Sequence, residues 1–444
     1  MSKNFVLLDD RTSPHLYIAQ SGLIGPGLPN HRTSFTAKAG DYILQDGSAK
    51  LEVRLNWSDG KGLQVDKIYT FHRSSYVIDV AYEIKNSSGS PIDPSAYFQL
   101  VHDSDLGKGT PMMTTFTGVA YFTDTDKYKK LTFPDMEKSN LSKSAKDGWI
   151  GLVQHYFVGA WIPKQGESRE YYTKRLSDNI YTAGAVIPIG SIATGTAKIT
   201  SVRIYAGPQE QANLMSVAPG LEYTVDYGWL TVVASPLFWV LSAIEKLSHN
   251  WGVAIILLTV LLKLLFFPLS AASYKSMAKM RNLAPRLERL KEQYGDDRQK
   301  LHQAMMDLYK TEKINPMGGC LPVVVQIPVF IALYWVLLGT VEMRHAPFML
   351  WIHDLSAADP YYVFPTLMGI TMLIQTKLNP KPPDPVQAKV MMIMPLVFSV
   401  FFFFFPAGLV LYWLVNNVLS IAQQWAINRA IDGGKAGTKG HAKA

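Results

Sequence analysis

The sequence predicts an α+β membrane protein, in which a β-sandwich domain is followed by a bundle of five transmembrane helices. Short runs of alternating apolar and polar residues occupy the first half, and five long apolar runs occupy the second. Basic residues flank these apolar runs, as they do on the cytoplasmic side of membrane proteins.

The composition of the 444 residues excludes several classes of protein. Hydrophobic residues make up 48% and charged residues 18%, against ~25% charged residues in soluble proteins, so the chain is neither disordered nor collagen-like. The single cysteine, Cys320, excludes a disulfide framework and a multi-cysteine metal site. Residues 228–444 hold 20 Lys and Arg against 12 Asp and Glu, which accounts for the whole net charge of +8. The basic excess therefore belongs to the apolar half and indicates a membrane protein before a nucleic-acid binder.

Residues 1–220 are predicted to form the β-sandwich. Alternation with a period of two marks strands with one buried face. Such strands are Leu51–Trp57, Val77–Lys85 and Ser201–Tyr205, with Gly-, Asn- and Pro-containing turns between the runs. The more continuously apolar run Trp149–Pro163 predicts a central pair of strands, and Gln209–Met215 predicts a short helix that closes the domain.

This domain shows no convincing catalytic site. Asp103 and Asp105 would share one face of a strand, but a surface or loop role is favoured over paired acid–base chemistry. His102 and His155 lack the spacing of metal ligands, and no phosphate-binding glycine loop, GxSxG or HExxH motif occurs. We therefore expect no enzyme activity, no metal and no other cofactor.

Residues 221–250 are predicted to form a linker and an amphipathic helix on the membrane surface. Trp229–Ile244 is apolar for 16 residues, which is short of the ~20 that cross a bilayer, and it contains Pro236. Tryptophans at 229 and 239 favour an interfacial helix over a span. The alternative matters, because one more crossing would move the β domain to the other side.

Residues 251–430 are predicted to form the membrane core. The five expected spans are about 251–269, 321–341, 361–376, 390–405 and 409–427. The last two are joined only by Pro406-Ala407-Gly408, which predicts a tight hairpin.

The distribution of charge predicts the orientation. Residues 275–313 carry ten Lys and Arg against six acids, and the loop 377–389 and the tail are also basic. The loop 342–359 carries one arginine against three acids and falls on the opposite side. Because positive residues stay inside, the β domain is expected outside the cytoplasm. Met1–Asp10 holds no export signal, so we expect a preceding span that this sequence lacks; an inverted topology is the alternative.

Residues 270–315 are predicted to form a cytoplasmic helical hairpin. Leucines recur at helical spacing on both sides of a break at Gly295-Asp296, and Asp297 could cap the second helix. Its expected functional residues are Met277, Met280, Arg281, Arg286, Arg289 and Met305. Methionine suits varied apolar partners, although packing of helix on helix explains the same stripe. The basic tail 431–444 is expected to be flexible; contact with ribosomal RNA is the alternative.

Lys263 decides the functional class, because a charged residue inside a span is costly and marks a candidate functional site. Thr259 lies one turn earlier on the same face. The alternative is that Lys263 extends to the lipid headgroups about 9 Å away. Further polar residues lie in the other spans: Gln326, Thr371, Gln375, Ser399, Asn416, Asn417, Ser420, Gln423 and Gln424. Each alone is typical of contacts between helices, but together they allow a hydrated, positively charged cavity.

Long ordered motifs resemble the YidC family of membrane protein insertases, which has mitochondrial and chloroplast relatives. They are DYGWL at 226–230, the Thr259–Pro268 span, and the segments 277–297, 315–335, 346–369 and 405–417. The similarity extends over essentially the whole chain, because the β domain also resembles the periplasmic domain of Gram-negative members.

This resemblance implies a signal-anchor span before a periplasmic β-supersandwich, an interfacial helix and five core helices around a hydrophilic groove. It implies insertion of nascent membrane proteins in the bacterial inner membrane without nucleotide hydrolysis, alone or with the Sec translocon. The ribosome and membrane lipids are the other implied partners. The expected groove residues are Lys263, Thr259, Gln326, Asn416 and Ser420, and the expected contacts to the substrate helix are Met368, Met372, Phe398, Tyr412 and Trp413. Family members usually have arginine at the position of Lys263, so only its charge, and not a bidentate contact, is carried over.

Three other classes are less consistent with the sequence. A secondary transporter would show internal repeats, and none is visible. A membrane-anchored periplasmic enzyme would need a catalytic constellation in residues 1–227. A channel would need a ring of selectivity residues, which one lysine does not supply.

Overall fold

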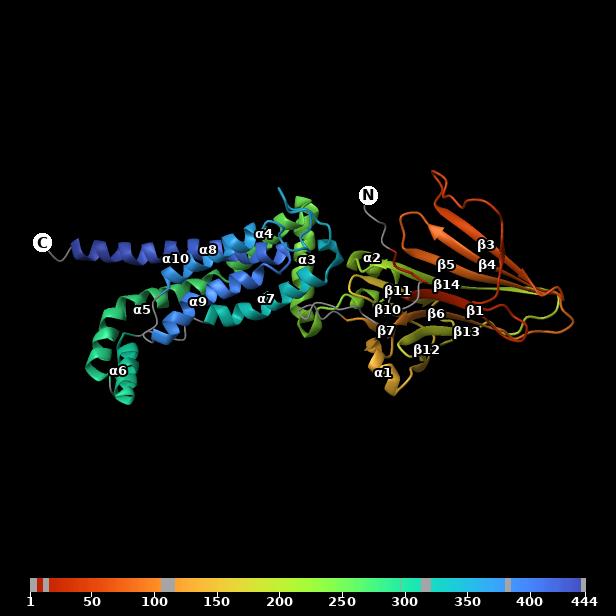
Figure 1. The fold of residues 1–444 in the computed structure, drawn as a ribbon, viewed down its shortest axis with the longest axis horizontal. Helices are drawn as coiled ribbons and strands as arrows, with labels where there is room; N and C mark the ends of the chain where they lie inside the picture. Colours follow the sequence, from red (N-terminus) through yellow and green to blue (C-terminus); the bar gives the residue numbers. More distant parts are fainter. Residues whose placement is uncertain are drawn as a thin grey trace. The chain divides into compact units, whose positions relative to one another are not determined.

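The computed structural model describes residues 6–10, 16–104, 116–295, 297–312, 321–379 and 385–440 (Figure 1). It divides into two compact units, Met1–Asp226 and Tyr227–Ala444, and each is described here by itself. Asp105 and Cys320, which the sequence analysis singled out, lie outside the described residues.

The first unit is a β-sandwich, as the sequence predicts. The strands are β1 Tyr17–Ile24, β2 Thr36–Ala37, β3 Lys50–Ser58, β4 Leu63–His72, β5 Val77–Asn86, β6 Ser95–Asp103, β7 Gly118–Thr123, β8 Lys127–Leu131, β9 Ser142–Ala145, β10 Trp149–Val153, β11 Phe157–Pro163, β12 Arg169–Ser177, β13 Ile180–Pro188 and β14 Thr196–Pro208. One sheet has five strands in the order β1-β6-β13-β12-β9, and the other has nine in the order β2-β3-β4-β5-β14-β11-β10-β7-β8. Within each sheet, the neighbouring strands pair in antiparallel fashion.

Large aromatic side chains fill the space between the two sheets. Phe98 of β6 contacts Trp161 of β11 with ring centroids 5.2 Å apart, and Tyr82 of β5 contacts Phe98 at 6.1 Å. All three side chains are buried. Aromatic pairs of this kind contribute ~0.5–1.5 kcal/mol beyond the area they bury, so they join the sheets across the core.

The apolar run 149–163 forms an antiparallel pair inside the nine-stranded sheet, which confirms that prediction. Ile150 of β10 pairs with Trp161 of β11, and β7 and β14 flank the two strands. Helix α1, Phe133–Lys138, follows β8, and α2, Gln211–Val217, follows β14. Helix α2 begins two residues later than predicted, because the Gln209 side chain donates instead to backbone carbonyls, including that of Phe157 at 3.2 Å.

Strand β4 carries a lysine toward the interior. Its alternation places Lys67 on the same face as the buried Val65. The Nζ atom of Lys67 lies 5.2 Å from the ring centroid of Tyr69 and 5.6 Å from that of Tyr82. It lies 3.5 Å from the carbonyl oxygen of Ser21, and within the described parts of the chain no carboxylate pairs with it. Burial lowers the pKa of Lys67 to about 8.

The second unit is helical. Its helices are α3 Thr231–Ser248, α4 Trp251–Leu265, α5 Phe267–Tyr294, α6 Arg298–Thr311, α7 Leu321–Gly339, α8 Val363–Leu378, α9 Pro385–Phe402 and α10 Ala407–Gly440. By length and composition, one helix of the described chain, Gly228–Ser248, could cross a membrane, and the bent pair α4–α5 could supply a second. Shorter apolar helices are Val324–Gly339, Val363–Leu378 and Lys389–Phe402. The count of five spans therefore stays a prediction.

The first expected span does not run straight from 251 to 269. Helix α4 ends at Leu265, and the chain bends by 66° before α5 continues to Tyr294. Pro268 lies in the first turn of α5, where its missing N–H and fixed φ are tolerated. The helix therefore breaks at Phe266, inside the segment predicted as the first span, and the limits of that span stay a prediction.

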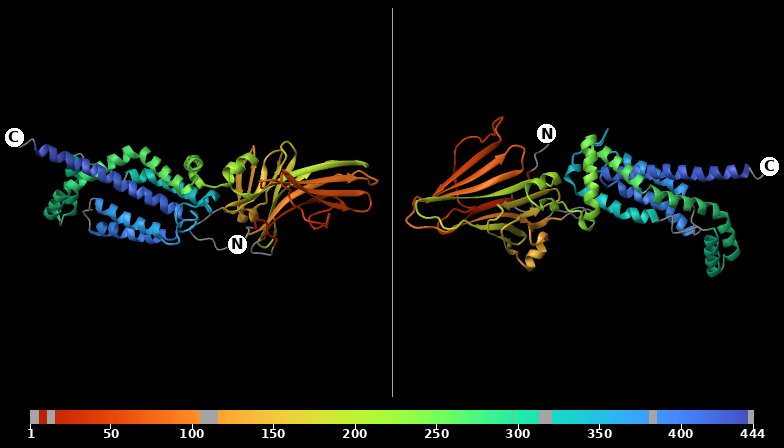
Figure 2. Two further views of the ribbon diagram at one scale, coloured as in Figure 1. Left: turned by 90° about the horizontal axis from the view of Figure 1, so that it is seen from above. Right: turned by 180° about the vertical axis from the view of Figure 1, so that it is seen from behind.

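Helix α3 runs crosswise to the long helices of its unit, as the views along two directions show (Figures 1 and 2). Val232 and Trp239, seven residues apart, are 86% and 72% exposed. Leu237 and Leu241 on its other side are buried. A helix with one exposed apolar face and a crosswise axis has the features of a helix that lies in a membrane surface.

A loop at one end of the helical unit is joined to its neighbours by backbone hydrogen bonds. Gly408 N donates to Leu355 O at 2.9 Å, and Ala407 N donates to Ala357 O at 2.7 Å. The Asn250 amide, which caps α4, donates to Phe348 O at 2.9 Å. These bonds hold the loop against the start of α4 and the turn before α10.

Candidate functional site

The helical unit contains a partly open cavity of about 390 Å³, lined by both polar and apolar side chains, between α4, α5, α7, α8 and α10. Its lining combines one charged residue with hydroxyl, amide, aromatic and methionine side chains. The lining residues are Lys263, Ser270, Ser273, Tyr274, Met277, Gln326, Ile327, Phe330, Met372, Gln375, Thr376, Asn379, Tyr412, Trp413, Asn416, Asn417 and Ser420.

Lys263 contributes the positive charge of this cavity. It lies in the last turn of α4, and its Nζ donates to Ser420 Oγ on α10 at 2.7 Å. The Ser420 hydroxyl in turn donates to the carbonyl of Asn416 at 2.6 Å. The side chain is partly buried, and its ammonium group is held at the α10 wall. This geometry keeps the charge beside the cavity.

Gln326 extends the polar network to a third helix. Its Nε2 on α7 donates to Asn416 Oδ1 on α10 at 3.1 Å. Buried polar groups require hydrogen-bond partners, so this amide pair and the Lys263–Ser420 bond join α4, α7 and α10. The cavity therefore has a polar wall built from three helices.

Two donors on the α10 wall have no hydrogen-bond partner within the described part of the chain. They are Nε1 of Trp413 and Nδ2 of Asn417, and both atoms are buried. Asn417 is only 5% exposed. Gln424, two turns farther along α10, does not line the cavity, and it donates to Oδ1 of the lining residue Asn379 at 3.1 Å.

The structure brings together most, but not all, of the predicted groove residues. Lys263, Gln326, Asn416 and Ser420 meet at the cavity. Thr259 does not line it: the side chain is buried, and its hydroxyl donates to Ile255 O of its own helix at 2.7 Å. A shared helical face with Lys263 was therefore not enough to place Thr259 in the site.

The predicted contacts to a substrate helix divide in the same way. Met372, Tyr412 and Trp413 line the cavity. Met368 is fully buried away from it, and Phe398 lies exposed on α9. The cavity residues Ser270, Ser273 and Tyr274 were not predicted, because the bend at Phe266 that turns α5 toward the cavity leaves no clear signal in the sequence. Asn379, at the end of α8, was not predicted either.

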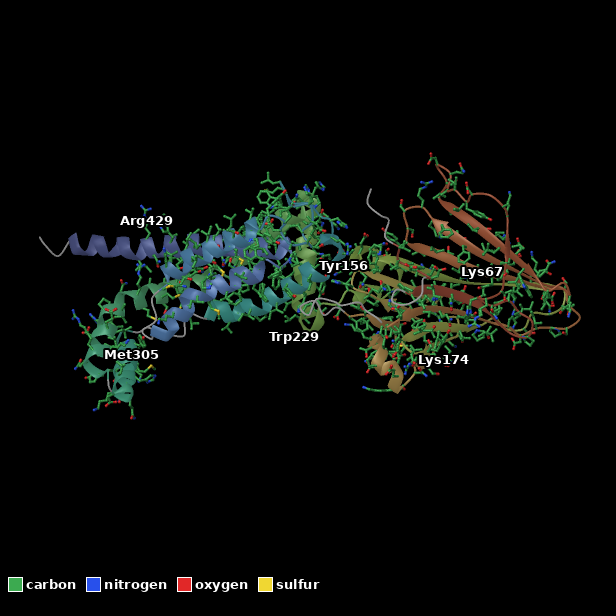
Figure 3. All side chains as sticks on the ribbon, in the orientation of Figure 1. Lys67, Tyr156, Lys174, Trp229, Met305 and Arg429 are labelled. Atoms are coloured by element: carbon green, nitrogen blue, oxygen red, sulfur yellow. The ribbon has the colours of Figure 1, made fainter. Side chains whose placement is uncertain are left out.

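The predicted hairpin helices pack on each other. Met280 and Met305 contact a cluster of the buried Leu283, Leu287 and Tyr309, so packing of helix on helix explains these two methionines. Met305 is labelled in Figure 3. Met277 instead lines the cavity. Asp297 caps α6 by accepting from Lys300 N at 3.1 Å, which confirms that expectation. Of the arginines, Arg281 and Arg289 are exposed, and Arg286 pairs with Glu312 at 2.6 Å.

Neither unit offers a metal site in the ranges that the structure describes: no three His, Cys, Asp or Glu side chains are grouped to hold an ion. The described chemistry of the cavity is therefore that of one ammonium group and neutral hydrogen-bonding groups.

Comparison with known proteins identifies the family. Residues 243–435 match the model described as 60Kd inner membrane protein, and residues 1–240 match the YidC periplasmic domain. A relative from Methylobacillus flagellatus, "Membrane protein insertase YidC", is 70% identical over 442 residues, which are 100% of this chain and 80% of the relative. A relative of the same description from Nitrosospira multiformis is 58% identical and covers 100% and 78%.

A solved structure described as "Active YidC insertase crystal structure with the first transmembrane domain resolved" is 20% identical, with a TM-score of 0.45, and the match covers 90% of this chain and 82% of that one. The family models together extend over nearly the whole chain, from the β-sandwich through the helical unit. The chain therefore belongs to the YidC family of membrane protein insertases, inner membrane proteins with a periplasmic domain.

Proposed function

We propose that this protein inserts nascent membrane proteins and that the cavity at Lys263 receives their hydrophilic segments. The observation that carries the proposal is the Lys263–Ser420 hydrogen bond inside a cavity lined by polar side chains of several helices. A structural lysine that only reached for lipid headgroups would not require a polar wall on α7 and α10.

The cavity lowers the cost of moving a polar segment across hydrocarbon. Each unsatisfied polar group costs several kcal/mol in the bilayer core. A water-containing cavity that opens part of the way shortens the apolar distance. The Lys263 ammonium adds attraction for acidic residues, since opposite charges attract more strongly away from bulk water.

The apolar helix of the substrate leaves along the lipid-facing helices. Met372 on α8 lies at the cavity, and Phe398 on α9 faces outward. Transfer of an apolar side chain into lipid is favourable by ~0.8 kcal/mol for each buried methylene, so partitioning of the substrate can drive the step without nucleotide hydrolysis.

The α5–α6 pair is proposed to receive the nascent chain from the ribosome in the cytoplasm. Met277 is shared between this pair and the cavity lining, so α5 forms a continuous surface between them. The exposed Arg281 and Arg289 suit contact with ribosomal RNA. Helix α3 is proposed to lie in the periplasmic surface of the inner membrane, with Trp239 among the lipid headgroups. The protein would act alone or beside the Sec translocon.

Reconstituted insertion tests the proposal. Proteoliposomes would be supplied with a small single-span substrate whose external segment carries acidic residues, and with a version in which these are amides. Lys263→Ala should reduce insertion of the acidic version several-fold more than that of the amide version, because only the former loses a charge partner. Lys263→Arg should retain activity. Lys279→Ala, which removes an exposed charge from α5, is the control. Equal losses for both substrates would show that Lys263 has no charge role.

A further inference from the structure

Asn417 has an unusual position among the polar residues of the cavity. It is 5% exposed, and its Nδ2 has no hydrogen-bond partner in the described residues. The neighbouring amide, Asn416, is engaged by Gln326 at 3.1 Å. An unpartnered buried donor is unfavourable, so a native protein retains one where another molecule supplies the acceptor.

Trp413 places a second such donor one turn away. Residues 413, 417 and 420 follow the i, i+4, i+7 spacing of one helical face, and all three line the cavity. Ser420 is already occupied by Lys263 and by the Asn416 carbonyl. The face of α10 therefore presents the Lys263 ammonium group bound to Ser420. About 4–11 Å nearer the start of the helix it presents two neutral N–H groups without a partner in the described residues.

We propose that Asn417, assisted by Trp413, is a substrate-binding residue that donates hydrogen bonds to main-chain carbonyl oxygens of the hydrophilic segment in transit. This inference rests on the proposed function, because it assigns a second recognition element to the same cavity. A neutral N–H donor matches the acceptor that every peptide unit carries. Lys263 selects acidic side chains, whereas Asn417 recognises the backbone and is indifferent to side-chain charge.

The carbonyl groups of an extended segment need this partner. Inside the cavity such a segment has neither a helix nor bulk water to satisfy all of its C=O groups, and each unsatisfied group opposes entry. Donors beyond the Lys263–Ser420 pair would hold the segment after its acidic residues have been attracted. The competing explanation is that an ordered water molecule alone accepts the hydrogen bond from Asn417.

The first arm of the test measures insertion by the full chain in proteoliposomes, with the acidic and amide substrates described above. Asn417→Leu removes the donor at similar size and should reduce insertion of both versions by the same factor of about 3- to 10-fold, the effect of one lost hydrogen bond. Asn417→Ser, which keeps a donor, should restore most of the activity. Loss confined to the acidic version, or no loss in a folded Asn417→Leu protein, would overturn the inference.

The second arm tests whether the hydrophilic segment of the substrate reaches the cavity at Asn417. In a background in which the single natural cysteine is replaced, Asn417→Cys and Gln326→Cys are tested for disulfide formation with a cysteine in the hydrophilic segment of a stalled substrate. Val418→Cys, one residue along α10 and 48% exposed, is the matched control and should not react. Both cavity cysteines should react. Reaction at both without loss in Asn417→Leu refutes only the donor role, and reaction at neither refutes the proposed function itself.

Discussion

Replacement of Lys67 by methionine is expected to stabilise the β-sandwich at neutral pH. Burial lowers the pKa of this lysine from 10.5 to about 8, so the charged form is disfavoured in the folded domain by about 3 kcal/mol, at ~1.36 kcal/mol for each pKa unit. Part of this cost is offset by the rings of Tyr69 and Tyr82, but no carboxylate among the described residues does so. Methionine keeps the length of the side chain and needs no solvation.

The pH dependence gives the sharper measurement. Between pH 8 and 10.5 the unfolded chain holds a proton on Lys67 that the folded domain has released, so the contribution of Lys67 to stability rises with pH in this window. From pH 7 to 9.5 this contribution gains about 2 kcal/mol by the same linkage. Burial also raises the pKa of Tyr69, to about 12, so ionisation of this tyrosine in the unfolded chain opposes the gain, and the difference between the wild type and Lys67→Met isolates the lysine.

Urea unfolding of residues 1–226, followed by circular dichroism at several pH values, would measure both effects. Lys67→Met should raise the free energy of unfolding at pH 7 by about 1–3 kcal/mol, and this advantage over the wild type should shrink by about 2 kcal/mol toward pH 9.5. Lys174→Met, a change at an exposed lysine of the same domain, is the control (Figure 3). A destabilised Lys67→Met domain, or an advantage that does not shrink with pH, would refute the reasoning.

Two further predictions concern backbone and packing. Gly148→Ala should destabilise the β-sandwich by more than ~2 kcal/mol, because the residue has φ of 85° and a Cβ there would clash with the carbonyl oxygen of Phe122. Gly166→Ala, at φ of 86° in open space, should cost only ~1 kcal/mol, and equal losses in urea unfolding would contradict the steric argument. Leu287→Ala should loosen the α5–α6 pair by ~2–5 kcal/mol and increase its cleavage by protease, whereas Arg286→Ala, which removes an exposed ion pair, should cost less than ~1 kcal/mol; the reverse ranking would contradict the packing described.

Local patterns predicted most of the β-sandwich. Alternation in Val77–Lys85 and the apolar run Trp149–Pro163 record which faces are buried, and burial is what sheet formation requires. Gln209 was assigned to the wrong element because its buried contacts come from residues more than fifty positions away. Such long-range contacts leave no local periodicity.

In the candidate site, too, local features were predictable and contacts between distant residues were not. Lys263 could be recognised because a charge inside an apolar run is costly whatever the tertiary structure. Its partner Ser420 is 157 residues away, so the sequence supplied candidates but not the pairing. Thr259 was misplaced because a hydroxyl can be satisfied by its own helix. The stripe formed by Trp413, Asn417 and Ser420 was detectable from helical spacing, and the residues were instead treated singly.

The hydrogen bonds from Ala407 and Gly408 to the loop at Leu355 bear on how the membrane keeps its ion gradients. Just beyond them, Leu409, Val410 and Leu411 are buried and apolar, so the first turn of α10 is packed against its neighbours. On the proposed function, this packing would let water and polypeptide enter the cavity from one side without giving protons or salts a path across the membrane. A gap in this packing would dissipate the membrane potential each time a substrate entered the cavity.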